Sequence, residues 1–294
     1  MNINTLWGLI ALYIALSFVI TRWLEKKIVG QHSRTKRFAW MYGIIFVISI
    51  GFWFLNGRPL SVWVLIATAI GIANGVGLYI RWKALNISLS GTSVLSFPDD
   101  LIAMGLSFFF LKEWILLNLP LGIGIALASS AAIALGLEKY KKKEPLLFFW
   151  YVGGYSVIWG LAYFLEKLFA ITGLHPAEFM FGWYGGCFLS ATALMLWHKE
   201  EAAYQNHTDG LKKKDFVFLS VLSLAIFTTM WAGLVVFRYT PQIAFQPILL
   251  VSEAIIPTAI GLWLFKERHQ YSKREKVLLG IAILGVIFIA LGLR

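Results

Sequence analysis

Charged residues and cysteine are both scarce in this sequence. Only 14% of the 294 residues are charged and 59% are hydrophobic, whereas soluble domains carry about 25% charged and 45–50% apolar residues. This balance excludes a soluble globular protein, and no polar tract is long enough for a disordered chain. The single cysteine, Cys187, excludes an intrachain disulfide, and no Cys/His cluster has the spacing of zinc ligands.

Signatures of catalysis are also lacking. The sequence contains no HExxH, GxSxG or Walker motif. The five histidines fall in predicted loops or at helix ends, so no nucleophile has a histidine partner at membrane depth. No predicted loop could hold a nucleotide-binding domain. We therefore expect a protein that is not an enzyme, needs no cofactor or metal, and takes any energy from a gradient or from exchange.

Long apolar runs take up most of the chain. A helix needs about 20 apolar residues to cross a bilayer, and ten stretches qualify: 3–20, 38–55, 60–80, 89–111, 114–137, 146–165, 177–197, 216–237, 243–265 and 277–293. They lack the polar and apolar alternation of barrel strands. The predicted fold class is an all-α integral membrane protein with ten transmembrane helices.

The basic residues lie between these runs, which argues against nucleic acid as the partner of a chain with net charge +11. Of the 26 Lys and Arg residues, 21 follow the first, third, fifth, seventh and ninth helices, and five lie elsewhere. Cytoplasmic loops accumulate Lys and Arg. The count predicts a multi-pass protein of the plasma membrane with both termini outside.

Short matches recur at nearly one spacing along the chain. Four of them are Trp7-Gly8-Leu9 with Trp159-Gly160-Leu161, Gly77-Leu78 with Gly233-Leu234, Lys112-Glu113 with Lys266-Glu267, and Gly124-Ile125-Ala126 with Gly280-Ile281-Ala282. The spacing predicts two five-helix repeats, 1–144 and 145–294, within one compact membrane domain. Because five is odd, the second repeat must cross the membrane inverted, as in secondary transporters.

These residues resemble the EamA-like transporters of the drug/metabolite transporter superfamily. The Trp-Gly pair early in each half is similar, as are Pro98, Lys112-Glu113 and Gly122-Ile123-Gly124 with their counterparts Pro257, Lys266-Glu267 and Gly280-Ile281-Ala282. The resemblance covers nearly the whole chain, through loose motifs. It implies a ten-helix carrier around a central cavity. It leaves the substrate open, and family members commonly have cytoplasmic termini, unlike the charge count here.

Three acidic residues fall inside predicted helices. Asp99 and Glu253 each lie about 15 Å deep at 1.5 Å per residue, are 154 residues apart, and are expected to be counterparts in the two repeats; Asp100 adjoins Asp99. Carboxylates near one another in a low dielectric repel, so at least one is expected to hold a proton. We expect these three residues to bind a proton or a cation at the cavity.

Each acid also has a structural interpretation. Phe97-Pro98-Asp99-Asp100 has the composition of a helix start, which would leave the aspartates facing the cytoplasm. Glu253 could be a protonated, hydrogen-bonded structural acid. Pro98 and Pro257 are both expected to kink their helices.

Aromatic and polar side chains supply further candidates. Most aromatic residues are expected to anchor helix ends at the interface, but Trp159, Tyr155 and Trp231 lie deeper and could enclose an organic cation. Asn74 could line the cavity or join two helices. Gly71 and Gly75 have the spacing of close helix packing.

The sequence therefore predicts a secondary carrier of a small amine, amino acid or similar solute, which works by alternating access with proton coupling or exchange. Two alternatives stay open: a uniporter or exchanger of neutral solutes such as sugars, and a membrane scaffold subunit that transports nothing. The expected partners are the small solute, the lipid bilayer and a second copy in a homodimer.

Overall fold

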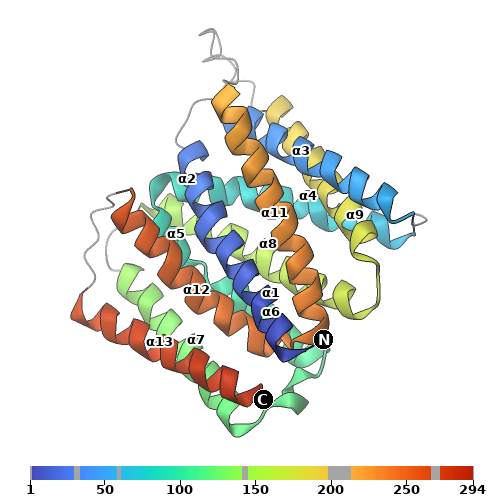
Figure 1. Cartoon of the computed structure of the whole chain (residues 1–294). Helices are drawn as coiled ribbons and strands as arrows, with labels where there is room; N and C mark the ends of the chain where they lie inside the picture. Colours follow the sequence, from blue (N-terminus) through green and yellow to red (C-terminus); the bar gives the residue numbers. More distant parts are fainter. Residues whose placement is uncertain are drawn as a thin grey trace. The chain divides into compact units, whose positions relative to one another are not determined.

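A computed structural model describes residues 2–29, 34–57, 61–140, 145–197, 213–265 and 272–293, and these ranges contain helices and turns but no strand. The helices are α1 (Ile3–Ile14), η1 (Ala15–Thr21), α2 (Arg22–Val29), α3 (Arg34–Leu55), α4 (Trp63–Ile87), α5 (Leu89–Leu95), α6 (Phe97–Phe110), η2 (Glu113–Leu116), α7 (Leu119–Tyr140), α8 (Leu146–Ile171), α9 (Pro176–Trp197), α11 (Lys213–Tyr239), α12 (Gln242–Trp263) and α13 (Lys273–Gly292). Figure 1 labels most of them.

Ten helical stretches in the described part of the chain are long and apolar enough to cross a membrane, as the sequence predicts. The spans are 4–28, 35–55, 63–87, 89–110, 119–138, 146–171, 176–197, 213–239, 242–261 and 273–292. The last of them starts at a capping box, in which Ser272 and Glu275 each accept a backbone N–H of the other.

The first span differs from its prediction, since it runs to Ile28 rather than Ile20. It is continuous through α1, the π-helical segment η1 and α2. The extension carries Arg22 and Glu25 into the helix, where both side chains are buried. Sequence hydropathy missed these residues because they are charged, although their charges are paired in the fold.

The chain forms two compact units. Unit 1 comprises residues 1–86 and 169–236, and unit 2 comprises residues 87–168 and 237–294. Unit 1 therefore holds α1 to α4, α9 and most of α11, and unit 2 holds α5 to α7, most of α8, α12 and α13. Each unit draws helices from both of the predicted repeats, 1–144 and 145–294, so the compact units are not the sequence repeats.

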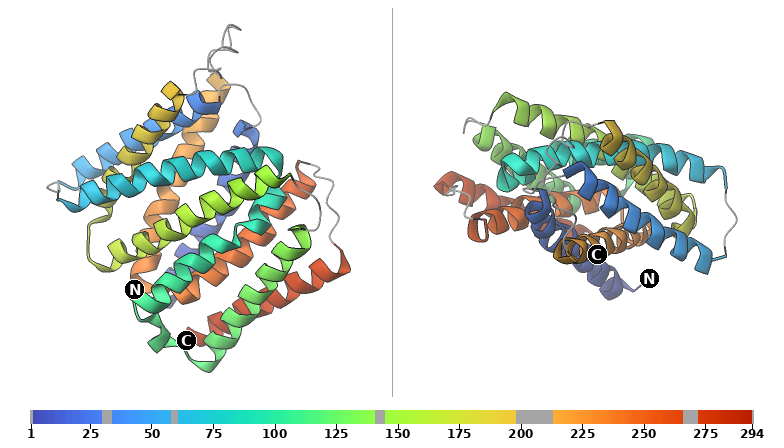
Figure 2. Two further views of the ribbon diagram at one scale, coloured as in Figure 1. Left: turned by 180° about the vertical axis from the view of Figure 1, so that it is seen from behind. Right: turned by 90° about the horizontal axis from the view of Figure 1, so that it is seen from above.

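Unit 1 is built on close packing of α9 against α3 and α4. The ring of Phe46 in α3 stacks on Phe188 in α9 with centroids 5.8 Å apart, and the views of Figures 1 and 2 both place α3 along α9. Gly71 and Gly75 of α4 meet α9, where a Cβ at Gly71 would lie 2.0 Å from the Trp183 carbonyl oxygen. The predicted glycine packing face is thus confirmed.

Unit 2 contains a second close pair, α7 and α13, which lie side by side in Figures 1 and 2. The backbones approach at Gly124 and Gly285, since a Cβ at Gly285 would lie 2.7 Å from the Ala128 nitrogen. In the same unit α12 packs against α5, α6 and α7. α12 is the most enclosed of the ten spans. Of an 18-residue apolar stretch within it, 76% is buried, against at most 50% of the corresponding stretch in the other spans.

Candidate functional site

The fourth span is broken near its centre. Ser88 caps α5 by accepting the Gly91 N–H at 2.9 Å, and α5 stops at Leu95. A new helix, α6, then starts at Phe97, with Pro98 in its first turn. Proline suits a first turn because its missing N–H has no helical partner there. Discontinuous helices of this kind border solute sites in transporters.

Asp99 and Asp100 lie in the first turn of α6. The helix-start interpretation is thus correct about where α6 begins. The two aspartates are nevertheless buried, since they are only 1% and 3% exposed and lie within the fourth apolar stretch. The Asp99 carboxylate accepts the Asp100 N–H at 2.8 Å, so this side chain also stabilises the first turn.

Tyr155 and Trp159 belong to α8 and lie in the same unit as the aspartates. The Tyr155 hydroxyl donates to the Thr92 carbonyl of α5 at 3.3 Å. Its ring is 6.1 Å from that of Trp159, which in turn is 5.9 Å from that of Tyr163. Gly160, which directly follows Trp159, lets α8 approach α6, since a Cβ there would lie 2.8 Å from the Asp99 carbonyl oxygen. The structure therefore joins these aromatic residues to the broken helix.

Glu253 lies in α12 and is 4% exposed. α12 remains helical from Gln242 to Trp263 through Pro247 and Pro257, and the predicted kink at Pro257 stays a prediction. Gln246 lies seven residues before Glu253, and Gln242 four residues before Gln246, so all three share one face of α12. Of these three residues, only Glu253 was predicted to be part of the site.

Gln246 is the unusual member of this face. It is 0% exposed, and neither its amide oxygen nor its amide nitrogen has a hydrogen-bond partner in the described part of the chain. Leaving such a group unsatisfied costs about 1–3 kcal/mol. A buried amide with unused donors and acceptors is suited to binding a polar solute or water.

Asn74 and Trp231 belong to unit 1. The Asn74 amide donates to the Cys187 sulfur of α9 at 3.5 Å, which favours the helix-joining interpretation of Asn74 over the cavity one. Trp231 is 36% exposed. The structure therefore brings five of the seven predicted residues into unit 2, and these two into unit 1.

Sequence reasoning missed a buried cluster in unit 2, formed by Glu113 and Lys167. The Glu113 carboxylate accepts the N–H groups of Gln242 and Ile243 at 3.0 and 2.9 Å, in the first turn of α12. Lys167 lies 3.6 Å from the same carboxylate and donates to the carbonyls of Phe237 and Thr240 at 2.6 and 2.9 Å. The Glu113–Lys167 pair thus provides hydrogen-bond partners for carbonyl groups at the end of α11 and for N–H groups at the start of α12.

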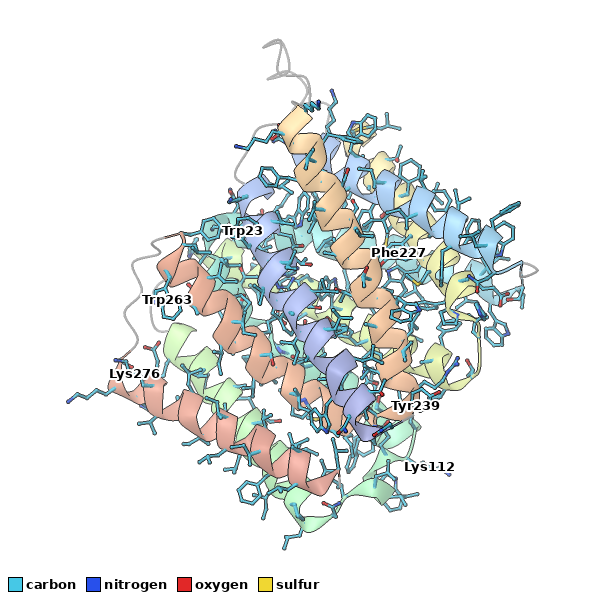
Figure 3. The ribbon with its side chains drawn as sticks, in the orientation of Figure 1. Trp23, Lys112, Phe227, Tyr239, Trp263 and Lys276 are labelled. Atoms are coloured by element: carbon cyan, nitrogen blue, oxygen red, sulfur yellow. The ribbon has the colours of Figure 1, made fainter. Side chains whose placement is uncertain are left out.

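A backbone turn places Glu113 in this position. Lys112 is the residue before it and has φ +54°, in the left-handed region that non-glycine residues rarely adopt. Figure 3 labels Lys112 at the turn that follows α6. The Ser107 hydroxyl adds a contact from α6 to the Gln242 side-chain oxygen. The predicted counterpart pair, Lys266-Glu267, lies outside the described residues.

A sequence signal for Lys167 does exist. Leu165-Glu166-Lys167 repeats Leu24-Glu25-Lys26 at a spacing of 141 residues. In unit 1 the Lys26 amine donates to the Leu85 carbonyl at 2.8 Å, two residues before the end of α4. Phe237 likewise lies two residues before the end of α11. Lys26 and Lys167 therefore make the same kind of contact, from the lysine amine to a carbonyl in the last turn of a helix.

The Trp-Gly match does not have equivalent surroundings. A Cβ at Gly8 would meet no atom within 4 Å, whereas Gly160 is tightly packed. The two glycines therefore differ in packing, and the Trp-Gly correspondence stays a prediction.

Unit 1 has its own buried ionic cluster around Glu25, which is 0% exposed. The Glu25 carboxylate pairs with Arg22 at 3.3 Å and Arg81 at 3.2 Å. It also accepts the indole N–H of Trp82 at 3.2 Å. The cluster ties α2 to α4, and its burial requires these partners because an unpaired charge would be costly.

Comparisons with known proteins bear on the fold alone. No family model matches the chain, and no curated protein matches it. A similar solved structure, described only as the crystal structure of a protein, has a TM-score of 0.69 and 13% identity. The match covers 98% of this chain and 96% of that chain. The chain therefore shares its fold, over nearly its whole length, with a protein of known structure.

Proposed function

We propose that this protein is a secondary-active membrane carrier of a small cationic or zwitterionic solute, coupled to protons or to exchange. The observation that carries the proposal is the buried face of α12, where Gln246 has unused hydrogen-bonding groups and Glu253 supplies a carboxyl group. Ionisable residues inside a membrane span are costly and are retained mainly for function. Glu253 would bind the cationic group or the proton, and Gln246 a neutral polar group.

The broken fourth span supports the same proposal. Its half-helix α6 has the buried residues Asp99 and Asp100 in its first turn. Tyr155 and Trp159 lie on α8, which approaches α6. Two carboxylates and an aromatic pair within one unit could bind an ammonium group through charge and cation–π attraction. The same residues suit a proton-coupled step, because protonation would release the cation.

Packing inside each unit favours an inverted repeat. In unit 1 the second span, α3, packs on the seventh, α9, and in unit 2 the fifth, α7, packs on the tenth, α13. Each pair joins spans with the same position in two five-span repeats. Lys26 and Lys167 add a third equivalence. Inverted repeats of five spans are the architecture of many alternating-access carriers, and the EamA-like resemblance points to the same class.

Transport can be tested in proteoliposomes that contain a pH-sensitive dye. Primary amines, amino acids and sugars would be added separately, with and without an imposed pH gradient. We expect an amine or amino acid to move protons, and Glu253→Gln to abolish this movement while the protein stays folded. Glu138→Gln is the matched control, because Glu138 lies at the end of α7 and pairs with Arg274, whose side chain is 71% exposed.

Each other outcome has a clear meaning. Sugar flux without proton movement would favour the neutral-solute uniporter. Proton-coupled flux that is unchanged in Glu253→Gln would remove Glu253 from the mechanism. Absence of flux and of ligand-induced thermal stabilisation with all three solute classes would favour the scaffold.

A further inference from the structure

Two lysines from distant parts of the sequence meet at one aromatic ring in unit 1. The amine of Lys27, in α2, lies 5.6 Å from the centroid of Phe218, in α11, and the amine of Lys214 lies 5.9 Å from it. The Lys27 amine is also 3.9 Å from the ring of Trp23, which Figure 3 labels at α2. The fold thus gathers two like charges over an aromatic surface.

Neither lysine makes an ion pair or a hydrogen bond with the rest of the described chain, and both side chains are exposed. The acids nearest to them in sequence are already engaged. Asp215 pairs with Arg37 at 3.2 Å, and Glu25 pairs with Arg22 and Arg81. The two ammonium groups are therefore available for an external anion, which would supply the countercharge that neither has in the described part of the chain.

An apolar strip continues from this charged position. Val217, Val221 and Leu224 follow Lys214 at intervals of three, four and three residues, so all four share a face of α11. The three apolar side chains are 53%, 47% and 56% exposed. A positively charged end followed by about 15 Å of apolar helix matches an anionic headgroup followed by an acyl chain.

We propose that Lys27 and Lys214 bind the phosphate of an anionic phospholipid, with its acyl chain along Val217, Val221 and Leu224. Trp23 and Phe218 supply the amphipathic ring surface that is typical of the headgroup region. Both lysines lie on the side that the charge count predicts to be cytoplasmic, where the anionic lipids are concentrated. The proposal rests on the membrane location given under the proposed function but not on transport.

Native mass spectrometry of the full-length protein with added phosphatidylglycerol or phosphatidylcholine tests the proposal. We expect wild type to retain phosphatidylglycerol in preference to phosphatidylcholine. Lys27→Gln/Lys214→Gln should weaken the binding of phosphatidylglycerol about 30-fold, because each lysine contributes a factor of about ten or less. The matched control is Lys273→Gln/Lys276→Gln, which removes two exposed lysines at the start of α13 and should leave binding unchanged. Lys27→Arg/Lys214→Arg should also retain binding.

Three results would overturn the proposal. They are equal binding of the two lipids by wild type, an equal loss in the α13 control, and displacement of phosphatidylglycerol by millimolar inorganic phosphate, which would indicate a free-phosphate site. Because the readout is binding, failure here would leave the transport proposal intact, and failure of the flux assay would leave the lipid site intact.

Discussion

Lys167 makes at the end of α11 the contact that Lys26 makes at the end of α4. The Lys26 amine lies 2.8 Å from the Leu85 carbonyl, and the Lys167 amine lies 2.6 Å from the Phe237 carbonyl. The last carbonyls of a helix have no intrahelical donor, and a lysine amine satisfies them while opposing the negative end of the helix dipole. The acidic residues near the two lysines have different partners. Lys167 pairs with Glu113, whereas Glu25, which precedes Lys26, pairs with two arginines.

The Glu113–Lys167 pair should be strongly coupled in stability. Lys167→Met is expected to lower the free energy of unfolding by about 3–5 kcal/mol, because it leaves a buried carboxylate without its cation. Glu113→Gln/Lys167→Met should be less destabilised than the sum of the single variants. Unfolding in detergent, followed by tryptophan fluorescence, measures all three. Strict additivity would show that the pair contributes no coupling energy.

Gln246→Leu should stabilise the protein and impair transport. Leucine removes a buried amide that has no described partner, which is worth about 1–3 kcal/mol. The same change removes the group that we propose binds the solute. A raised melting temperature together with a raised KM would support this role. Destabilisation would instead indicate that the Gln246 amide makes a structural contact.

Gly285→Ala should separate α7 from α13. A Cβ at this position would lie 2.7 Å from the Ala128 nitrogen and 2.9 Å from the Gly124 oxygen, and both atoms belong to backbone that cannot move aside. We expect a loss of about 1–3 kcal/mol, as in other overpacked cores. Gly280→Ala on the same helix is the control, because its Cβ would meet no atom within 4 Å. Equal melting temperatures for the two variants would contradict the packing argument.

Asp99→Ala and Asp99→Asn should have different effects on stability. The Asp99 carboxylate accepts a first-turn N–H of α6 and lies at the positive end of that helix. The alanine variant should cost about 0.5–2 kcal/mol, the range for a lost helix cap. Asparagine keeps an oxygen that can accept the same N–H, so Asp99→Asn should cost less. Thermal unfolding of the two variants compares them, and the reverse order would refute the capping role.

The sequence by itself determined the ten apolar helices and placed Asp99, Asp100 and Glu253 inside them, although it missed Glu25 in the longer first helix. Helix formation and membrane length are local properties, so runs such as 216–237 can be identified without knowledge of their neighbours. The depth of Glu253 follows from its position in an apolar run. The start of α6 at Phe97 could be predicted as well, since Pro98 and two aspartates form a recognisable first turn.

Only the tertiary structure decided which side chains meet. The repeat of Leu24-Glu25-Lys26 at Leu165-Glu166-Lys167 singles out Lys167 in the sequence. It does not indicate that Lys167 pairs with Glu113, 54 residues away, or contacts the end of α11. Gln246 could not be identified from the sequence, because a buried amide without a hydrogen-bond partner is recognised only once the surrounding helices are in place. Such features depend on which helix faces pack together, and small residues such as Gly71 and Gly285 decide this through backbone contacts that hydropathy does not record.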